Sequence, residues 1–289
     1  MDRHAQGFLP EFGCVRTVAS LTSQLLAESS FEIIPMKNTL EKAAALPAGS
    51  SVSVTASPAK GMDATLDLTI ELCSRGYRAV PHLSARMIKD RPQLAGLIKR
   101  MQGAEIDDVF VVGGDADDPG RFPDALSLLR EMADIGHNFS DVGITGYPEG
   151  HPFISGDLLR QAMIDKQRYA TYIATQMCFD VSGIESWIKG IRIDGVKLPV
   201  KVGIPGVTDP VKLIGIAGRI GVGTSVRFLR KNRRAVWRMI FPGAYKPTKL
   251  LKKLGDLDPH LGFFGLHIFT FNQIEPTVQW WTEQTSRAS

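Results

Sequence analysis

The stretch Val109–Gly120, VFVVGGDADDPG, decides the fold that this sequence predicts. Four apolar residues, most of them β-branched, run into two glycines, and Asp115 follows at once. A short, continuous apolar run is typical of a strand buried on both faces. Glycine lets the backbone turn tightly and approach a ligand closely. Ligands of parallel α/β folds bind at the carboxyl ends of the strands, so we expect Asp115 to lie at a binding site.

Similar stretches recur along the chain, separated by amphipathic helical patterns. In one such pattern Pro123 opens a predicted helix whose inner face is Leu126, Leu129 and Ala133. Alternating strands and helices favour parallel pairing through right-handed crossovers. We therefore predict an α/β fold, a closed (β/α)8 TIM barrel over residues 31–289, with an open doubly wound sheet as the alternative. The predicted strands cover residues 31–35, 51–56, 78–84, 108–114, 141–147, 171–179, 200–206 and 265–271.

Two segments do not follow this alternation of strands and helices. Residues 1–30 form an N-terminal extension, with a helix predicted over Val15–Ala27. Residues 221–263 are long for one crossover and predict one or two extra helices between strands seven and eight. The basic stretch 227–253 there is either a solvated face or a positive field that attracts an anionic ligand. Its basic residues are Arg227, Arg230, Lys231, Arg233, Arg234, Arg238, Lys246, Lys249, Lys252 and Lys253.

The composition narrows the class of protein. Of the 289 residues 44% are hydrophobic and 22% charged, as in soluble globular proteins, and the net charge of +4 does not favour a nucleic-acid partner. Three widely spaced cysteines predict neither a disulfide framework nor a zinc site. No apolar run predicts a membrane span or a signal peptide, so we expect a cytoplasmic protein. The sequence leaves the oligomeric state open, a homo-oligomer included.

Polar side chains cluster where the predicted strands end. Glu32 lies within FEIIP, and apolar surroundings would favour its protonated form, which suits a proton donor. The other candidates are Thr55, Ser57, His82, Asp115, Tyr147, Glu149, His151, Thr175 and Gln176. The histidines and acids fall on separate strands without HxH or HExxH spacing, so we predict no metal site. Such a rim could bind a flat heteroaromatic ligand and move a proton.

The order of these motifs resembles the catalytic barrel of the methylenetetrahydrofolate reductase family, over residues 31–280. The family's opening FEFFPP is similar to FEIIPM here, its PHLT to PHLS, and its YPExHP to YPEGHP. VTAS, GGD, TQMCFD, IPGV and FTFN stand where the family has VTYG, RGD, TQxFFD, PGI and YTLN. Each motif alone is weak, but their shared order makes the resemblance specific.

The resemblance implies an oxidoreductase of one-carbon metabolism and methionine biosynthesis. NADH or NADPH would reduce FAD, which would pass the hydride to 5,10-methylenetetrahydrofolate and give 5-methyltetrahydrofolate. Glu32 would be the general acid for folate N10, Asp115 would recognise the pterin beside the flavin, and Gln176 would contact folate. The positions implied to bind the cofactor are Thr55, His82, Gly114, Asp115, Tyr147, His151 and Lys166.

Two departures from the family pattern touch FAD binding. Gly113 stands where the family has arginine, and Gln167-Arg168-Tyr169-Ala170 replaces a small-residue segment. Direct hydride transfer from NAD(P)H to folate is therefore an alternative mechanism. The sequence also leaves open a methyltransferase that uses methyltetrahydrofolate, and a barrel that merely binds folate.

Overall fold

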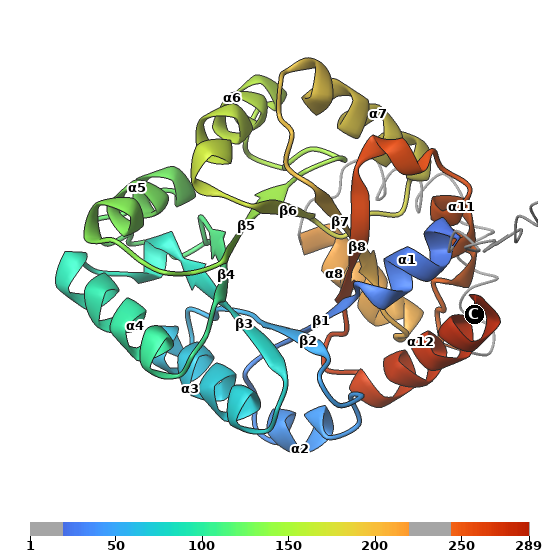
Figure 1. The fold of residues 1–289 in the computed structure, drawn as a ribbon, viewed down its shortest axis with the longest axis horizontal. Coiled ribbons are helices and arrows are strands. Elements are labelled where there is room, and N and C mark those ends of the chain that lie inside the picture. Colours follow the sequence, from blue (N-terminus) through green and yellow to red (C-terminus); the bar gives the residue numbers. More distant parts are fainter. Residues whose placement is uncertain (1–19, 220–243, 289) are drawn as a thin grey trace, which may run out of the picture.

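The computed structural model describes residues 20–219 and 244–288, and eight parallel strands in it close into a barrel (Figure 1). Each strand pairs with the next along the chain, and β1 pairs with β8. This closure confirms the predicted (β/α)8 barrel and excludes the open sheet. The strands are β1 (Ser30–Ile33), β2 (Ser51–Val54), β3 (Arg78–Ser84), β4 (Asp108–Val112), β5 (Asp141–Gly146), β6 (Tyr172–Thr175), β7 (Val200–Pro205) and β8 (Phe263–Phe269).

Helices surround the barrel, as the ribbon shows (Figure 1). The α-helices of the described residues are α1 (Leu21–Ala27), α2 (Thr39–Ala43), α3 (Gly61–Ser74), α4 (Arg91–Gly103), α5 (Ala125–Ile135), α6 (Gly156–Lys166), α7 (Val181–Ile193), α8 (Pro210–Arg219), α11 (Thr248–Gly255) and α12 (Ile274–Ala288). Short 3-10 turns are η1 (Ala85–Met87), η2 (Gln167–Tyr169) and η3 (Pro259–Leu261).

The apolar run that begins at Val109 explains why the strands are buried on both faces. Val109 and Val111 belong to the large hydrophobic layer between the barrel and the helices, whereas Phe110 belongs to a small separate cluster with Tyr172 and Ala174. Successive side chains of a strand point to opposite faces, so this second cluster fills the barrel interior. The same alternation sends Phe31 and Ile33 outward and Glu32 inward.

The inner face of α5 differs from the prediction. The carboxylate of Asp124 accepts a hydrogen bond from the backbone N–H of Ser127 at 2.8 Å and caps a helix that begins at Ala125 rather than Pro123. The predicted Leu126 is only half-buried and Ala133 is exposed. The helix is therefore rotated relative to the expected stripe, and its buried residues are Ala125, Leu128, Leu129 and Met132.

The two segments outside the repeat are described in part. Helix α1 packs against β8 and α12 and ends at Ala27 as predicted, while residues 15–19 of the expected helix lie outside the described residues. Helix α11 confirms an extra helix between β7 and β8. Its leucines are buried, whereas Lys249, Lys252 and Lys253 are exposed. This part of the basic stretch is the solvated face of an amphipathic helix, and Arg227–Arg238 lie outside the described residues.

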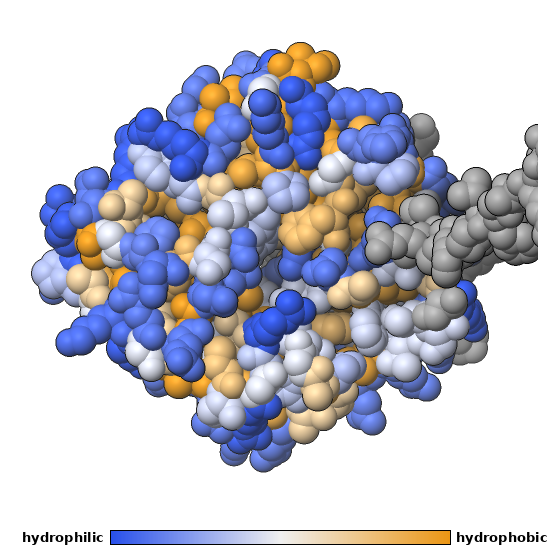
Figure 2. Space-filling model, in the orientation of Figure 1, coloured by the Kyte–Doolittle hydropathy of each residue, from blue (hydrophilic) through white to orange (hydrophobic). Residues whose placement is uncertain are grey.

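The surface of the described residues agrees with the composition. The face in Figure 2 is mostly hydrophilic, with hydrophobic residues scattered among polar ones. No helix in the described part of the chain is both long and apolar enough to cross a membrane. Cys73 and Cys178 are free thiols, and Cys14 lies outside the described residues.

Candidate active site

A cavity of about 940 Å³ opens at the carboxyl ends of the strands. Its wall contains residues that follow β3, β4, β5 and β6, and its floor contains side chains of β1 and β8. Parallel strands all end at the same side of a barrel, which is why residues far apart in sequence meet there. The cavity brings together eight of the candidate site residues: Glu32, His82, Gly114, Asp115, Tyr147, His151, Thr175 and Gln176.

Glu32 and His267 form the centre of the floor. The Nε2 atom of His267 lies 3.0 Å from Oε2 of Glu32, and its Nδ1 atom lies 3.2 Å from the hydroxyl of Ser30. His267 is 4% exposed, and the side chain of Glu32 is 13% exposed toward the cavity. The sequence predicted apolar surroundings for Glu32, but its apolar neighbours Phe31 and Ile33 face the helices. The carboxyl group instead has a polar partner and an opening to the cavity.

His82 lies beside this pair without joining it. Its Nε2 atom is 2.6 Å from the hydroxyl of Ser53 and 4.0 Å from Oε2 of Glu32. Burial lowers the pKa of His82 to about 4, a shift that the negative charge of Glu32 only partly opposes. His82 is therefore a neutral ring at neutral pH, and it packs against Phe110 with 4.8 Å between ring centres and the ring planes tilted by 46°.

The possible ligand atoms of Glu32, His82 and His267 all lie within 4.8 Å of one another. Two imidazoles and a carboxylate are a donor set that binds zinc or iron. In this structure, however, each of the three side chains has a hydrogen-bond partner in the protein. Spacing along the sequence missed this cluster because its members come from β1, β3 and β8, and barrel closure alone brings them together.

The turn after β4 carries Gly113, Gly114 and Asp115. Gly114 has a φ of +85°, and a Cβ atom there would overlap the hydroxyl oxygen of Ser84. The close approach that requires glycine is therefore made by β3. The Ser84 hydroxyl is buried and has no hydrogen-bond partner in the described structure, and it lines the cavity. Asp115 is exposed at the rim beside it.

The segment after β5 places aromatic rings at the cavity rim. Tyr147 and His151 meet edge to face at 5.2 Å, and Phe153 lies next to His151 with 90% of its surface exposed. Burial raises the pKa of Tyr147 and lowers the pKa of His151, so both rings are neutral near pH 7. Glu149 faces elsewhere, since its carboxylate accepts hydrogen bonds from the backbone N–H groups of Phe179 and Asp180.

The end of β6 supplies an amide to the cavity. The side-chain oxygen of Gln176 accepts a hydrogen bond from the backbone N–H of Met177 at 3.1 Å, and the side chain lines the cavity. Thr175 also lines it, but its hydroxyl is used within the fold: it accepts from the backbone N–H of Gly203 and donates to the carbonyl of Gln176. Gln176 is thus the better placed of the two to meet a ligand.

Thr55, Ser57 and Lys166 do not line the cavity with the other candidates. Thr55 follows β2, and its carbonyl accepts a hydrogen bond from Thr65 on α3. Lys166 lies at the end of α6, 7% exposed, and has no hydrogen-bond or ion-pair partner among the described residues. Burial lowers its pKa to about 8, and the charge of Asp124 opposes that shift. Because Asp124 does line the cavity, Lys166 lies behind the wall.

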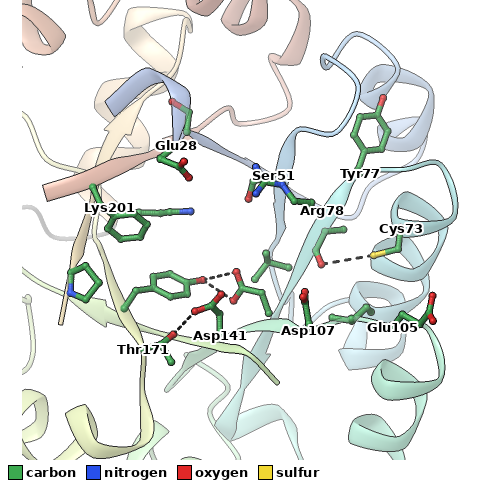
Figure 3. Close-up of a pocket in the computed structure, with 18 of the residues that line it drawn as sticks. Glu28, Ser51, Cys73, Tyr77, Arg78, Glu105, Asp107, Asp141, Thr171 and Lys201 are labelled. Carbon is green, nitrogen blue, oxygen red and sulfur yellow. Dashed lines mark hydrogen bonds between the residues drawn. The ribbon is translucent and has the colours of Figure 1, made fainter. Parts of the chain in front are cut away.

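A second cavity, of about 500 Å³, lies at the opposite end of the barrel (Figure 3). Lys201 extends over the rings of Tyr172 and Phe264, and the Tyr172 hydroxyl donates to Asp108 at 3.1 Å. Burial raises the pKa of Asp108 to about 7. Phe110 stacks on both Tyr172 and His267 and so separates this polar end from the candidate active site. Amino-terminal ends of barrel strands serve stability rather than catalysis.

His267 and Ser84 are the residues that sequence reasoning missed as members of the site. His267 interrupts the apolar run GLHIF, and an isolated histidine at an alternating position of a strand is a signal for an inward-facing ring. Ser84 was part of PHLS, but nothing in the sequence shows that its hydroxyl is left without a partner.

Comparisons with known proteins agree with the fold and add a family. A family profile described as Methylenetetrahydrofolate reductase matches residues 35–221. The matched range includes β2 to β7 with Asp115 and Gln176, and it ends before β8.

Solved structures are similar at low identity. A GH18 chitinase from Pseudoalteromonas aurantia is 11% identical, with 91% of this chain and 100% of that chain covered and a TM-score of 0.50. A putative lyase/mutase from Burkholderia cenocepacia J2315 is 13% identical, with 92% and 84% covered and a TM-score of 0.47. At these identities the chitinase shows a shared fold and nothing about chemistry.

Proposed function

The chain belongs to the methylenetetrahydrofolate reductase family, and on that premise we propose that it interconverts 5,10-methylenetetrahydrofolate and 5-methyltetrahydrofolate at the expense of NADH or NADPH. The observation that carries the proposal is the carboxyl group of Glu32, held by His267 on the floor of a cavity that also presents Asp115 and Gln176. This is an acid beside two groups that can hydrogen-bond a heteroaromatic ring.

The reaction needs both a hydride and a proton. The methylene carbon gains the hydride, its bond to N10 breaks, and N10 takes a proton, while the nicotinamide is oxidised. Glu32 is the group we assign to N10, because its carboxyl opens onto the cavity and its Oε2 atom already lies 3.0 Å from Nε2 of His267. General acid catalysis of this kind contributes about 10²–10⁴-fold to a rate.

Recognition of the pterin belongs to the opposite wall. Asp115 has no hydrogen-bond partner among the described residues, and the NH₂ group of Gln176 forms no hydrogen bond in that part of the chain. A carboxylate and an amide together can pair with the donor and acceptor edge of a pterin. The unpartnered Ser84 hydroxyl beneath Gly114 adds a third polar group that a ligand would satisfy.

FAD, which the resemblance implies as hydride carrier, fits this cavity in part. The volume of about 940 Å³ and the rings of Tyr147 and His151 suit an isoalloxazine, which would supply a hydride acceptor and donor. The diphosphate fits less well. Among the described residues that line the cavity, Arg86 is the only lysine or arginine. Its guanidinium already donates to the carbonyls of Ala116 and Asp117. Lys166 lies behind the wall.

Direct transfer of the hydride from the nicotinamide to folate is the second candidate. The observation that favours it is Gly113, where no atom lies within 4 Å of a Cβ built on the residue and no cation replaces the family's arginine. The assignments of Glu32, Asp115 and Gln176 are the same for either route, because they concern folate.

The proposal is tested by incubating the purified chain with 5,10-methylenetetrahydrofolate and either NADH or NADPH, and identifying the folate product by chromatography. We expect 5-methyltetrahydrofolate, one for each nicotinamide oxidised. Absence of product with both nucleotides, with and without added FAD, would contradict the proposal. An absorbance scan of the same protein separates the routes, since bound flavin gives a yellow protein and direct transfer needs none.

A further inference from the structure

We propose that His267 is a positioning residue of the proton step, which fixes one oxygen of the Glu32 carboxyl group and leaves the other to carry the transferable proton. The inference rests on the proposed function and extends it to a residue in β8, outside the matched residues 35–221. It is carried by the contacts that link Ser30, His267 and Glu32.

The pairing of β1 with β8 places the His267 imidazole between Ser30 and Glu32. Ser30 and His267 are register partners in the β1–β8 pair that closes the barrel, so the serine hydroxyl lies beside the imidazole. The hydroxyl is 3.2 Å from Nδ1 and 3.4 Å from the carbonyl oxygen of Leu266. Glu32 lies on the same face of β1 as Ser30, two residues further along the strand toward the cavity. The imidazole therefore lies between the two side chains.

The contact with Glu32 fixes the role of Nε2. Once Glu32 has given up its proton, its carboxylate can only accept, so Nε2–H is the donor to Oε2 at 3.0 Å. The Ser30 hydroxyl lies 3.2 Å from Nδ1 and holds the ring from its other side. Ser30 and His267 are both 4% exposed, so water has little access to compete for these contacts. With Oε2 occupied in this way, Oε1 is the atom available to hold a proton toward the cavity.

The same hydrogen bond favours proton transfer. When Oε1–H gives its proton to N10, the carboxyl group becomes a carboxylate, and the bond from Nε2–H becomes charge-assisted. A hydrogen bond that strengthens as charge develops stabilises the transition state more than the ground state. No proton has to move through the ring, because the proton that N10 receives comes from Oε1 of Glu32.

His82 cannot take this part, although it is the other histidine on the floor. Its Nε2 atom is 4.0 Å from Oε2, beyond hydrogen-bond distance, and Ser53 already holds it at 2.6 Å. These two histidines lie within 4.0 Å of the Glu32 carboxyl group. The other titratable or charged groups of the described residues that line the same cavity come from the segments after β3, β4 and β5, and they are Arg86, Asp115, Asp117, Asp124, Tyr147 and His151. Of these groups, His267 makes the hydrogen bond.

The test compares the pH dependence of kcat for folate reduction in the wild type, His267→Leu, His267→Gln and Ser30→Ala. Loss of the donor makes the carboxylate less favourable, so His267→Leu should lower kcat about 10- to 100-fold and move the basic limb of the profile to higher pH. Glutamine keeps an N–H donor and should leave the limb closer to its wild-type position. Ser30→Ala should move it the same way by less.

The outcomes separate the inference from the proposed function. If the wild type is active and the basic limb of the pH profile stays at the same pH in the variants, the role of His267 is overturned, whatever the value of kcat. A wild type that makes no 5-methyltetrahydrofolate overturns the proposed function and this inference with it. Ser30→Ala removes one hydroxyl and leaves the hydrophobic core unchanged. Its pH profile can therefore be compared with that of the wild type even if His267→Leu melts below the assay temperature.

Discussion

The side chains of Glu32 and His267 are 235 positions apart in the sequence and 3.0 Å apart in the barrel. They meet because β1 and β8 close the sheet, with Ser30 opposite His267 and Glu32 opposite Phe269. A carboxyl group with one oxygen held and the other facing a cavity of about 940 Å³ is a proton donor with a fixed direction. The proposed chemistry depends on this arrangement.

Gly114→Ala should destabilise the protein by about 1–3 kcal/mol, because it forces a Cβ into a positive-φ position and against the hydroxyl of Ser84. Gly113→Ala is the matched control, since no atom lies within 4 Å of a Cβ built on that residue. Denaturant unfolding of the two variants measures the difference. Equal stability of the two would show that the turn after β4 does not need glycine at Gly114.

Asp108 should make the stability depend on pH in a specific direction. Its pKa is about 7 in the fold against an ordinary value of 3.8, so between these values the folded state binds more protons than the unfolded state. The free energy of unfolding therefore falls as pH rises from about 4 to 7. Asp108→Asn mimics the protonated form and should melt higher than the wild type near pH 8, but not near pH 4. A constant difference across this range would contradict the assignment.

Lys166→Met should stabilise the fold. The ammonium is 7% exposed without a hydrogen-bond partner in the described structure, and methionine removes that desolvation cost. Its pKa of about 8 lies below the ordinary 10.5, so the gain is present below pH 8 and disappears as pH rises toward 10.5. Thermal melting at pH 7 and pH 10 measures the gain.

If Lys166 reaches a cofactor phosphate, the same variant should bind NAD(P)H or FAD about tenfold more weakly. Titration of each nucleotide into the wild type and the variant gives this comparison. A gain in stability with unchanged nucleotide affinity would assign Lys166 a purely structural place behind the cavity wall.

The sequence could predict which residues meet in the site, because the carboxyl ends of all strands of a parallel barrel lie at the same edge. This brought Asp115, Tyr147 and Gln176 to one cavity from three separate motifs. The surroundings of a strand residue were less predictable. The sequence neighbours of Glu32 are apolar, but alternation turns them away, and its true neighbour comes from the far end of the chain.

Other residues lay beyond what periodicity can give. Thr55 and Lys166 carry polar groups at plausible positions, but neither lines the cavity, and Lys166 is buried at the end of α6. Helix α5 begins at Ala125, after the Asp124 cap, rather than at Pro123, and its buried face is Ala125, Leu128, Leu129 and Met132. Such details depend on side-chain contacts between elements, which hydrophobic spacing does not encode.

The central claim is that Glu32 protonates folate during hydride transfer, and the most direct measurement is 5-methyltetrahydrofolate formation by Glu32→Gln. The account predicts a fall of about 10²–10⁴-fold in kcat, with the dissociation constant of the folate substrate nearly unchanged. Glu28→Gln, in the cavity at the other end of the barrel, is the matched control and should keep wild-type turnover. Wild-type kcat in Glu32→Gln would contradict the account.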